Sequence, residues 1–298
     1  MDLTVALEAF AASVGAAGPV TVAGSGTRGG PVADARIVHA PAGIEWIEAD
    51  EMVVSCGAGT TVADLSTALA GVNQGVALPA GGTVGGALAV GHSDVRRLGY
   101  GPMRDVLLET HYISHAGIVV KAGGPTVKNV SGFDLCRLLV GSRGTLGFLG
   151  SVILRTRPLP PVSQWHAARV DPFATLAALH RPVSVLWDGA TTWALLEGHA
   201  DDVAEQAALA GLSPTDGAPE LPDAERWSVA PSRLADLAGS SGFVAEIGVG
   251  VVHHCVPQPE RPLDPAVVAL HERIKHEFDP EGRLNPGLDV LRPNRVRA

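Results

Sequence analysis

The chain has 298 residues, of which 46% are hydrophobic and 18% are charged, and its formal net charge is −9. This is a globular composition, and the negative charge argues against nucleic acid as the main partner, because phosphate binding needs clustered lysine and arginine. Three cysteines far apart, with no C-x-x-C, argue against a disulfide framework or a cysteine metal site and favour a reducing compartment. The acidic N-terminus lacks the basic region of a signal peptide, and no window of 18 residues is uninterruptedly apolar. We therefore expect a cytoplasmic protein with no transmembrane segment.

Short strands and helices alternate in the first part of the chain. Apolar residues at helical spacing predict a helix over 3–14, and Thr61 is a suitable N-cap for a helix that runs to about residue 69. Strands are expected over 19–23, 37–38, 44–47, 51–56, 105–111, 118–121 and 149–155, and a short helix over 135–140.

Three prolines within 158–161 fix φ and remove hydrogen-bond donors, so residues 157–161 mark the clearest boundary in the chain. The elements that follow predict a small α+β unit with helices on one face of a sheet. They are expected as strand 164–170, helix 173–180, strands 183–187 and 192–197, helix 202–210, a mobile loop over 213–223, helix 231–238, a strand pair or long strand over 242–255, and a last helix over 265–277.

Residues 79–93 form a glycine-rich stretch without acidic or basic side chains, which we interpret as a loop that wraps a ligand. Its glycines permit φ > 0 and a close approach of the backbone, and exposed N–H groups suit a phosphate or the polar edge of a flat cofactor. Residues 24–29 spell G-x-G-x-x-G after a predicted strand. A Rossmann NAD site would need a helix to begin there, and Gly30-Pro31 does not supply one. A third glycine cluster occupies 141–147.

With three glycine clusters the chain resembles the FAD-binding domain of vanillyl-alcohol oxidase, p-cresol methylhydroxylase and related flavoproteins. The resemblance runs from about residue 20 to 157. It is carried by the stretches 79–91, 96–105 (Arg-Arg-Leu-Gly-Tyr-Gly-Pro-Met-Arg-Asp), 128–135 and 141–147, and by the ending Phe278-Asp279-Pro280…Leu284-Asn285-Pro286-Gly287. The Arg-Arg-Leu-Gly-Tyr-Gly stretch looks most like the FAD-binding subunit of glycolate oxidase.

The resemblance implies an α+β fold: a two-subdomain FAD-binding domain of the vanillyl-alcohol oxidase type with a small α+β cap domain. The FAD-binding domain is expected over 1–160, the cap or substrate domain over 161–256, and a C-terminal segment that returns to the FAD domain over 257–298.

The resemblance also implies which residues hold FAD. The first glycine loop would hold the FAD pyrophosphate, and residues 79–93 would line the flavin and diphosphate. Residues within 128–134 would support the flavin loop, and Gly144 and Gly147 would let the backbone approach the adenosine side. The implied cofactor residues are Gly24, Ser25, Gly26, Thr27, Arg28, Gly29, Pro79, Ala80, Gly81, Gly82, Thr83, Gly85, Gly86, Gly91, His92, Ser93, Lys128, Asn129, Gly132, Asp134, Gly144, Gly147 and Asn285. By residue type alone Lys128 is a solvated loop lysine, Asp134 a turn or cap residue, and His92 a polar loop histidine. No histidine or cysteine lies within 24–30, so non-covalent FAD is expected.

The chain departs from the family in its substrate region. Hydroxy-acid-oxidising relatives carry H-x-G-D-G-N-x-H where this chain has residues 246–253, and only Gly248, Gly250 and His253 fit. Val249 and Val251 offer no polar ligand, so no metal site is expected. Arg143 stands where catalytic relatives commonly have an acid. His253 or Glu246 is the best candidate for the base that takes the hydroxyl proton.

Two functions fit these residues. In the first, the chain is a flavoenzyme subunit that moves electrons from a small 2-hydroxy acid through FAD to an iron–sulfur partner, in a complex with a larger FAD-linked oxidase subunit. In the second, it is a non-catalytic FAD-binding or assembly subunit of such a complex. Either could sit at the membrane periphery through its partners. A NAD-binding Rossmann protein is a third reading, which Pro31 disfavours.

Overall fold

The computed structural model describes residues 3–124, 134–222, 225–260 and 262–291. The chain divides into two compact units, which are described separately. Unit 1 comprises residues 1–93, 102–159 and 263–298, and unit 2 comprises residues 94–101 and 160–262. Residues 94–101, which lie in the range expected for the FAD-binding domain, thus belong to unit 2.

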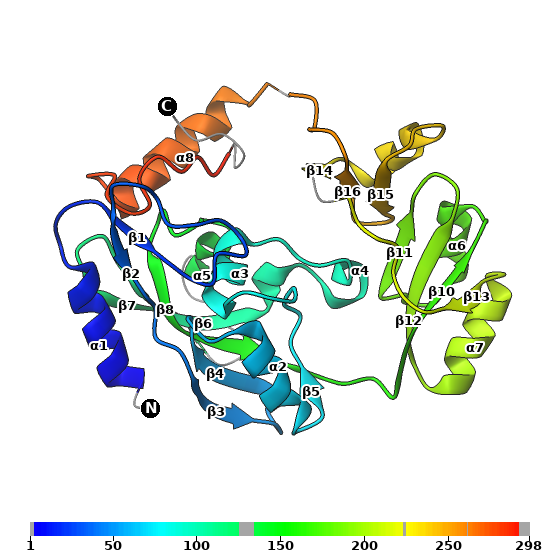
Figure 1. The fold of residues 1–298 in the computed structure, drawn as a ribbon, viewed down its shortest axis with the longest axis horizontal. Helices are drawn as coiled ribbons and strands as arrows, with labels where there is room; N and C mark the ends of the chain where they lie inside the picture. Colours follow the sequence, from blue (N-terminus) through cyan, green and yellow to red (C-terminus); the bar gives the residue numbers. More distant parts are fainter. Residues whose placement is uncertain (1–2, 125–133, 223–224, 261, 292–298) are drawn as a thin grey trace. The chain divides into compact units, whose positions relative to one another are not determined.

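Unit 1 is built from short helices and small sheets (Figure 1). Its elements are α1 (Leu3–Val14), β1 (Val20–Val22), β2 (Arg36–Val38), β3 (Ile44–Glu48), β4 (Val53–Gly57), α2 (Val62–Ala70), β5 (Gln74–Gly75), α3 (Val84–Val90), the 3₁₀ helix η1 (Met103–Asp105), β6 (Leu107–Ile113), β7 (Val119–Gly123), α5 (Leu135–Leu139), β8 (Phe148–Arg155), β9 (Arg157–Pro158) and α8 (Pro265–Phe278).

An antiparallel sheet of five strands, in the order β3-β4-β8-β6-β7, is the frame of unit 1. Helices α2, α3 and α5 bury their apolar side chains with this sheet in the main hydrophobic core. Helix α1 packs closely on β8 at Gly150, where an added Cβ would lie 2.4 Å from the Leu7 side chain. The parallel pair β1–β2 forms a separate small sheet, and the loop that leaves β1 carries the first glycine cluster.

Unit 2 is a seven-stranded antiparallel sheet with helices against it (Figure 1). Its elements are α4 (Arg97–Tyr100), β10 (Val162–Ala168), α6 (Pro172–Ala178), β11 (Ser184–Trp187), β12 (Thr192–Gly198), α7 (Ala200–Leu209), β13 (Ser213–Thr215), β14 (Glu225–Ser228), the 3₁₀ helix η2 (Pro231–Leu237), β15 (Phe243–Glu246) and β16 (Val251–His254). The strand order is β13-β10-β12-β11-β15-β16-β14.

The two faces of this sheet differ in chemistry because side chains alternate along each strand. One face supplies Trp187, Leu196, Phe243 and other apolar side chains to a core that includes residues of α6, α7 and η2. The opposite face of the inner strands carries apolar side chains such as Leu186 and Val244 but also Ser184 and Glu246, and for these polar groups we call it the polar face. The predicted α+β class, with helices on one face of this sheet, is confirmed.

The sequence-based expectation was wrong for part of the 79–93 stretch, because residues 84–90 form helix α3 rather than loop. Thr83 caps this helix by accepting from the Gly86 N–H, and Val84, Ala87 and Leu88 bury one side of it. Capping and burial outweigh the low helix propensity of its two glycines. Within the expected loop over 213–223, residues 213–215 form the edge strand β13, paired with β10.

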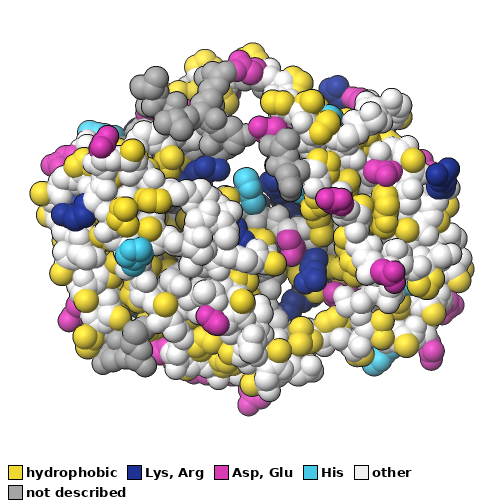
Figure 2. Space-filling model, viewed as in Figure 1, with side chains coloured by type: hydrophobic (Ala, Val, Ile, Leu, Met, Phe, Trp, Pro, Cys, Tyr) yellow, Lys and Arg dark blue, Asp and Glu magenta, His cyan; other side chains and the backbone are white. Residues whose placement is uncertain are grey.

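No helix in the described ranges is long and apolar enough to cross a membrane. Acidic and basic side chains are interspersed on the face of the molecule shown in Figure 2.

Candidate functional site

Unit 1 contains a cavity of about 310 Å³ that is lined mostly by backbone and small side chains. Its wall includes all six residues of the first glycine loop and members of the other two clusters. The predicted cofactor residues that line it are Gly24, Ser25, Gly26, Thr27, Arg28, Gly29, Thr83, Gly85, Gly86, Gly144, Gly147 and Asn285. The fold thus brings four separate sequence motifs to one cavity.

Arg28 ties the first glycine loop to the second. Its guanidinium donates to three successive carbonyl oxygens, those of Pro79 at 3.1 Å, Ala80 at 2.9 Å and Gly81 at 2.8 Å. At Gly82 an added Cβ would lie 2.1 Å from the Arg28 guanidinium, so only glycine fits beside this contact. The structure therefore gives Arg28 a loop-fixing role, and its predicted phosphate contact stays a prediction.

The third glycine cluster is bonded to the end of α3. The Gly141 N–H donates to the Leu88 carbonyl at 3.0 Å, and the Arg143 N–H donates to the Ala89 carbonyl at 2.8 Å. Gly91 ends α3 with φ of 71°, and a Cβ there would lie 2.8 Å from Gly141. Glycine is required at Gly91 both by the left-handed conformation and by the close approach of a second backbone.

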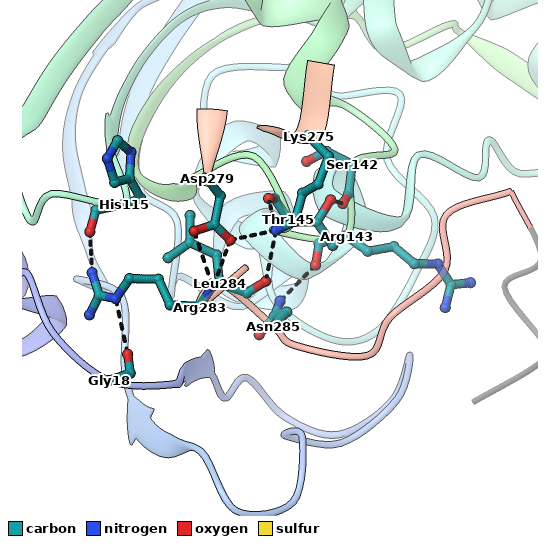
Figure 3. A network of polar contacts seen from close by, with 10 residues as sticks. All are labelled: Gly18, His115, Ser142, Arg143, Thr145, Lys275, Asp279, Arg283, Leu284 and Asn285. Atoms are coloured by element: carbon teal, nitrogen blue, oxygen red, sulfur yellow. Dashed lines mark hydrogen bonds and ion pairs between the residues drawn. The ribbon is translucent and has the colours of Figure 1, made fainter. Parts of the chain in front are cut away.

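The C-terminal segment after α8 reaches this cavity and braces the third cluster (Figure 3). The Asn285 side-chain amide donates to the Arg143 carbonyl at 2.6 Å, and its Oδ1 is buried without a hydrogen-bond partner. A Cβ on Gly144, whose φ is 70°, would lie 2.7 Å from the Asn285 amide nitrogen. A free acceptor in the cavity wall can receive a polar hydrogen of a ligand.

A network of buried charges holds that segment in place (Figure 3). Lys275 donates to Asp279 at 2.5 Å and to the Thr145 carbonyl at 2.7 Å, so it links α8 to the third glycine cluster. Asp279 in turn accepts from the backbone N–H groups of Arg283 and Leu284 at 3.1 and 2.8 Å.

Arg283 is 3% exposed and forms the other end of the network. Its guanidinium donates to the carbonyls of Val14, Gly15, Ala17, Gly18 and His115, which close the C-terminal end of α1 and the turn between β6 and β7. Burial lowers the pKa of Arg283, and the nearby positive charge of Arg36 lowers it further. A guanidinium has five donor hydrogens, and five carbonyl partners suit this geometry.

The remaining predicted cofactor residues lie at the edges of the site or outside the described residues. Ser93 accepts from the Met103 N–H at 3.0 Å, and His92 is exposed. Asp134 caps α5 and pairs with Arg137 at 3.1 Å, which is the capping role its residue type allowed. Lys128, Asn129 and Gly132 fall outside the described residues.

Several residues of the cavity wall were not predicted from the sequence. They include His39, Ala40, Ala58, Gly59 and Phe148, whereas Ala89, Ser142 and Arg143 lie within the predicted stretches 79–93 and 141–147. One signal was available, because Gly57 and Gly59 flank Ala58 after a strand. A Cβ on Gly57 would lie 2.3 Å from the Pro41 carbonyl oxygen, and one on Gly59 would lie 2.4 Å from that of Ala40, so these glycines allow two backbones to meet.

The two residues predicted as catalytic lie together in unit 2, on the polar face. The His253 Nε2 is 2.9 Å from the Glu246 Oε1, across the β15–β16 hairpin. The Glu246 side chain is 2% exposed, and its Oε2 is buried without a hydrogen-bond partner. The neighbouring His254 faces the other way and stacks on Trp227, with ring centroids 4.2 Å apart. An imidazole and a carboxylate are both side chains that can act as general bases, so this pair offers a proton acceptor.

The matching glycines of the substrate motif have a structural role here. Gly248 and Gly250 have φ of 82° and 85° and turn the chain between β15 and β16. A Cβ on Gly250 would lie 2.2 Å from the Val229 carbonyl oxygen. Within the described residues no three His, Cys, Asp or Glu side chains gather as a group that could hold a metal ion.

The cavity of unit 1 suits a large polar cofactor with phosphates. Glycines of all three clusters lie in its wall, and Arg143 adds a guanidinium whose pKa is lowered by burial. Gly144 lies against the Asn285 side chain, and a larger residue at position 144 would disrupt this contact. These residues fit FAD, the cofactor that the sequence predicts.

Comparison with known proteins gives the same cofactor. Residues 7–123 match the model of a family described as an FAD binding domain. The chain is 38% identical over 117 residues to D-lactate dehydrogenase of Archaeoglobus fulgidus, an alignment that covers 38% of this chain and 26% of that protein. It is 26% identical to glycolate oxidase subunit GlcE of Escherichia coli, over 90% of this chain and 92% of that subunit. The chain thus spans about a quarter of the dehydrogenase and nearly all of the subunit.

A solved structure shares the fold over most of the chain. Alkyldihydroxyacetonephosphate synthase superposes with a TM-score of 0.67 at 13% identity, covering 94% of this chain and 73% of that one. Together with the match of residues 7–123 to an FAD binding domain, this similarity supports the predicted α+β fold.

Proposed function

We propose that this chain, whose residues 7–123 belong to the FAD binding domain family, is the FAD-carrying subunit of a complex that oxidises a small 2-hydroxy acid such as glycolate. The observation that carries the proposal is the 26% identity to a glycolate oxidase subunit over nine-tenths of the chain, combined with a cavity built from all three glycine clusters. A larger FAD-linked oxidase subunit, an iron–sulfur subunit and a cytoplasmic location, at the membrane periphery through those partners, belong to the same proposal.

Unit 1 would hold the cofactor. The loop fixed by Arg28 and the wall braced by Asn285 supply backbone donors for the pyrophosphate and a free acceptor for a ring or ribose hydrogen. When bound, FAD supplies a two-electron acceptor for the oxidation of a carbinol carbon. The expected attachment is non-covalent, through these contacts.

Unit 2 would supply the proton acceptor. The Glu246–His253 pair, joined at 2.9 Å, would take the proton of the substrate hydroxyl. The burial of Glu246 keeps this contact away from competing water.

The second candidate function is an FAD-binding assembly subunit with no reaction of its own. Val249 and the buried Val251 favour it, because they stand where hydroxy-acid-oxidising relatives have polar residues. The glycines retained from that motif serve the hairpin turn, which needs no substrate.

Anaerobic addition of glycolate to the purified, FAD-loaded chain separates the two functions. Glycolate should bleach the flavin absorbance of the wild type. His253→Gln should keep its bound flavin, but glycolate should no longer bleach it. His254→Gln is the matched control, since that side chain lies on the opposite face of the same strand. A yellow protein that glycolate does not bleach, alone or with its partners, supports the assembly role. A colourless chain that binds NADH contradicts both.

A further inference from the structure

Two arginines of unit 2, Arg226 and Arg97, take no part in the contacts described above. Arg226 lies on β14 directly opposite His253 of β16, so both side chains project from the polar face. Its Nη2 is buried and has no hydrogen-bond partner in the part of the chain that the structure describes. Arg97 lies in α4, and within the described residues no hydrogen bond or ion pair engages its side chain either.

Segment 94–101 is fixed to the same sheet. The Gly99 N–H donates to the Val183 carbonyl at 3.0 Å, and a Cβ on Gly99 would lie 2.7 Å from Val183. The Tyr100 hydroxyl lies 2.8 Å from each carboxylate oxygen of Glu197 on β12. These contacts hold Arg97 against unit 2.

Strand pairing places Arg226 beside the Glu246–His253 pair, and the charges of Glu246 and Arg97 both act on it. Burial lowers the pKa of Arg226, the negative charge of Glu246 opposes that change, and the positive charge of Arg97 adds to it. Like charges that repel each other in a partly buried place are stabilised when an anion binds between them. Glu246 does not serve as that anion, because its Oε1 is bonded to His253 and no hydrogen bond joins it to Arg226 in the described residues.

The unsatisfied groups define the ligand. Arg226 Nη2 is a donor that lacks an acceptor, and Glu246 Oε2 is an acceptor that lacks a donor. A small 2-hydroxy acid carries both complements on adjacent carbons, carboxylate oxygens for the arginines and a hydroxyl hydrogen for Glu246. A buried polar group without a partner is unfavourable, and a ligand that pairs with it removes that cost.

We infer that Arg97 and Arg226, beside the Glu246–His253 pair, form a binding site for a small carboxylate that bears a neighbouring hydroxyl group. The inference rests on the proposed function for the identity of this ligand as substrate, while the site itself rests on unit 2 alone. Arg97 and Arg226 bind the carboxylate, and Oε2 of Glu246 accepts the hydroxyl hydrogen, so the Glu246–His253 pair takes the hydroxyl proton as a unit.

Calorimetric titration of the FAD-loaded full chain tests the site with three probes: glycolate, the redox-inert dianion oxalate, and glycolamide, which lacks the carboxylate charge. Glycolate and oxalate should bind, and glycolamide should bind at least about tenfold more weakly, since bonds to charged groups contribute about 1.5–3 kcal/mol. Arg226→Gln and Arg97→Gln should each weaken oxalate about tenfold or more, with unchanged flavin content. Arg226→Lys should recover part of the loss, because lysine keeps the charge but not the planar fork.

Arg233→Gln is the matched control, because Arg233 is an exposed arginine of unit 2 paired with Asp236. Equal oxalate affinity in the wild type and in Arg97→Gln would overturn the inference, as would equal affinity for glycolamide and glycolate. If Arg226→Gln does not fold, the oxalate affinities of Arg97→Gln and Arg226→Lys still test the inference, since Arg97 is only half-buried.

The two proposals can fail separately. If oxalate binds through the arginines but glycolate never bleaches the flavin, the proposed oxidation fails and the carboxylate site stands. If glycolate bleaches the flavin with the same KM in Arg226→Gln as in the wild type, the oxidation stands and the assignment of Arg226 is wrong.

Discussion

The two units use different parts of the polypeptide to make a site. In unit 1 the cavity wall is mostly backbone, and glycine is required wherever a Cβ would meet another backbone or a fixed side chain, as at Gly144 and Gly91. In unit 2 the candidate site consists of polar side chains, Glu246, His253 and Arg226, on a sheet whose glycines only turn the chain. A backbone site depends on the main chain being held still, whereas a side-chain site depends on which groups share a face.

The largest effect is expected when the bracing of unit 1 is removed. Arg283→Met should destabilise the chain by about 3–5 kcal/mol, because five carbonyl groups lose their charged hydrogen-bond donor at once. Denaturant unfolding measures the loss, and flavin release should follow it. Arg155→Met, which changes an exposed arginine of the same unit, should stay within about 1 kcal/mol of the wild type. Equal stability of the two variants would show that the network does not brace the unit.

A smaller and more local effect is expected at the cavity wall. Gly144→Ala places a Cβ 2.7 Å from the Asn285 amide and forces a non-glycine residue to φ of 70°. Strain of about 1–3 kcal/mol at this position should lower FAD affinity about tenfold to a hundredfold. Fluorescence titration with FAD measures the change.

Gly18→Ala is the control for Gly144→Ala. It introduces the same backbone strain without a new side-chain contact, because Gly18 has φ of 74° and no atom lies within 4 Å of an added Cβ. It should cost stability but leave FAD affinity near that of the wild type. A similar loss of affinity in both variants would mean that the Asn285 contact does not matter.

The contrast between the units also explains what could be predicted from the sequence. The glycine clusters were recognisable because a backbone site imposes glycine at fixed local spacing, and Gly24, Gly85 and Gly144 all line one cavity. Helix α3 was missed, since glycine has low helix propensity and the burial of Leu88 is a tertiary effect.

In unit 2 the sequence indicated Glu246 and His253 but not Arg226. The face on which Arg226 lies is set by the pairing of β14 with β16, and β14 is a four-residue strand with no clear alternation. Arg97 was noted only as part of a family motif, because its membership of unit 2 depends on contacts such as Gly99 to Val183. Long-range register therefore limits what local patterns reveal of a side-chain site.

A third effect concerns charge within unit 2. Burial raises the pKa of Asp94, and the negative charges of Glu246 and Glu197 add to this, against the Arg96 N–H and its charge. A carboxyl whose pKa is raised in the folded state contributes stability below its unfolded pKa and loses it as pH rises through the folded value. Asp94→Asn keeps the acceptor for the Arg96 N–H at 2.9 Å and should stabilise the chain at pH 7 by up to about 1 kcal/mol.

The stabilisation by Asp94→Asn should disappear below about pH 4, where the carboxyl is protonated in both states. Denaturant unfolding at the two pH values measures it. A variant less stable than the wild type at pH 7 would show that the charge of Asp94 is compensated by a partner.

The smallest effect is expected at the surface of unit 2, where Arg233 pairs with Asp236 while their side chains remain 71% and 56% exposed. Solvent and salt screen such a pair, and Arg233→Met should change the free energy of unfolding by less than about 1 kcal/mol. Its counterpart is the Lys275–Asp279 pair of unit 1, in which the Asp279 side chain is fully buried and also holds two backbone N–H groups. Lys275→Met should therefore cost several times more in the same denaturation experiment, since it leaves a buried carboxylate without its cation. Equal losses of stability in Lys275→Met and Arg233→Met would mean that burial does not make the ion pair of unit 1 stronger than the exposed pair of unit 2.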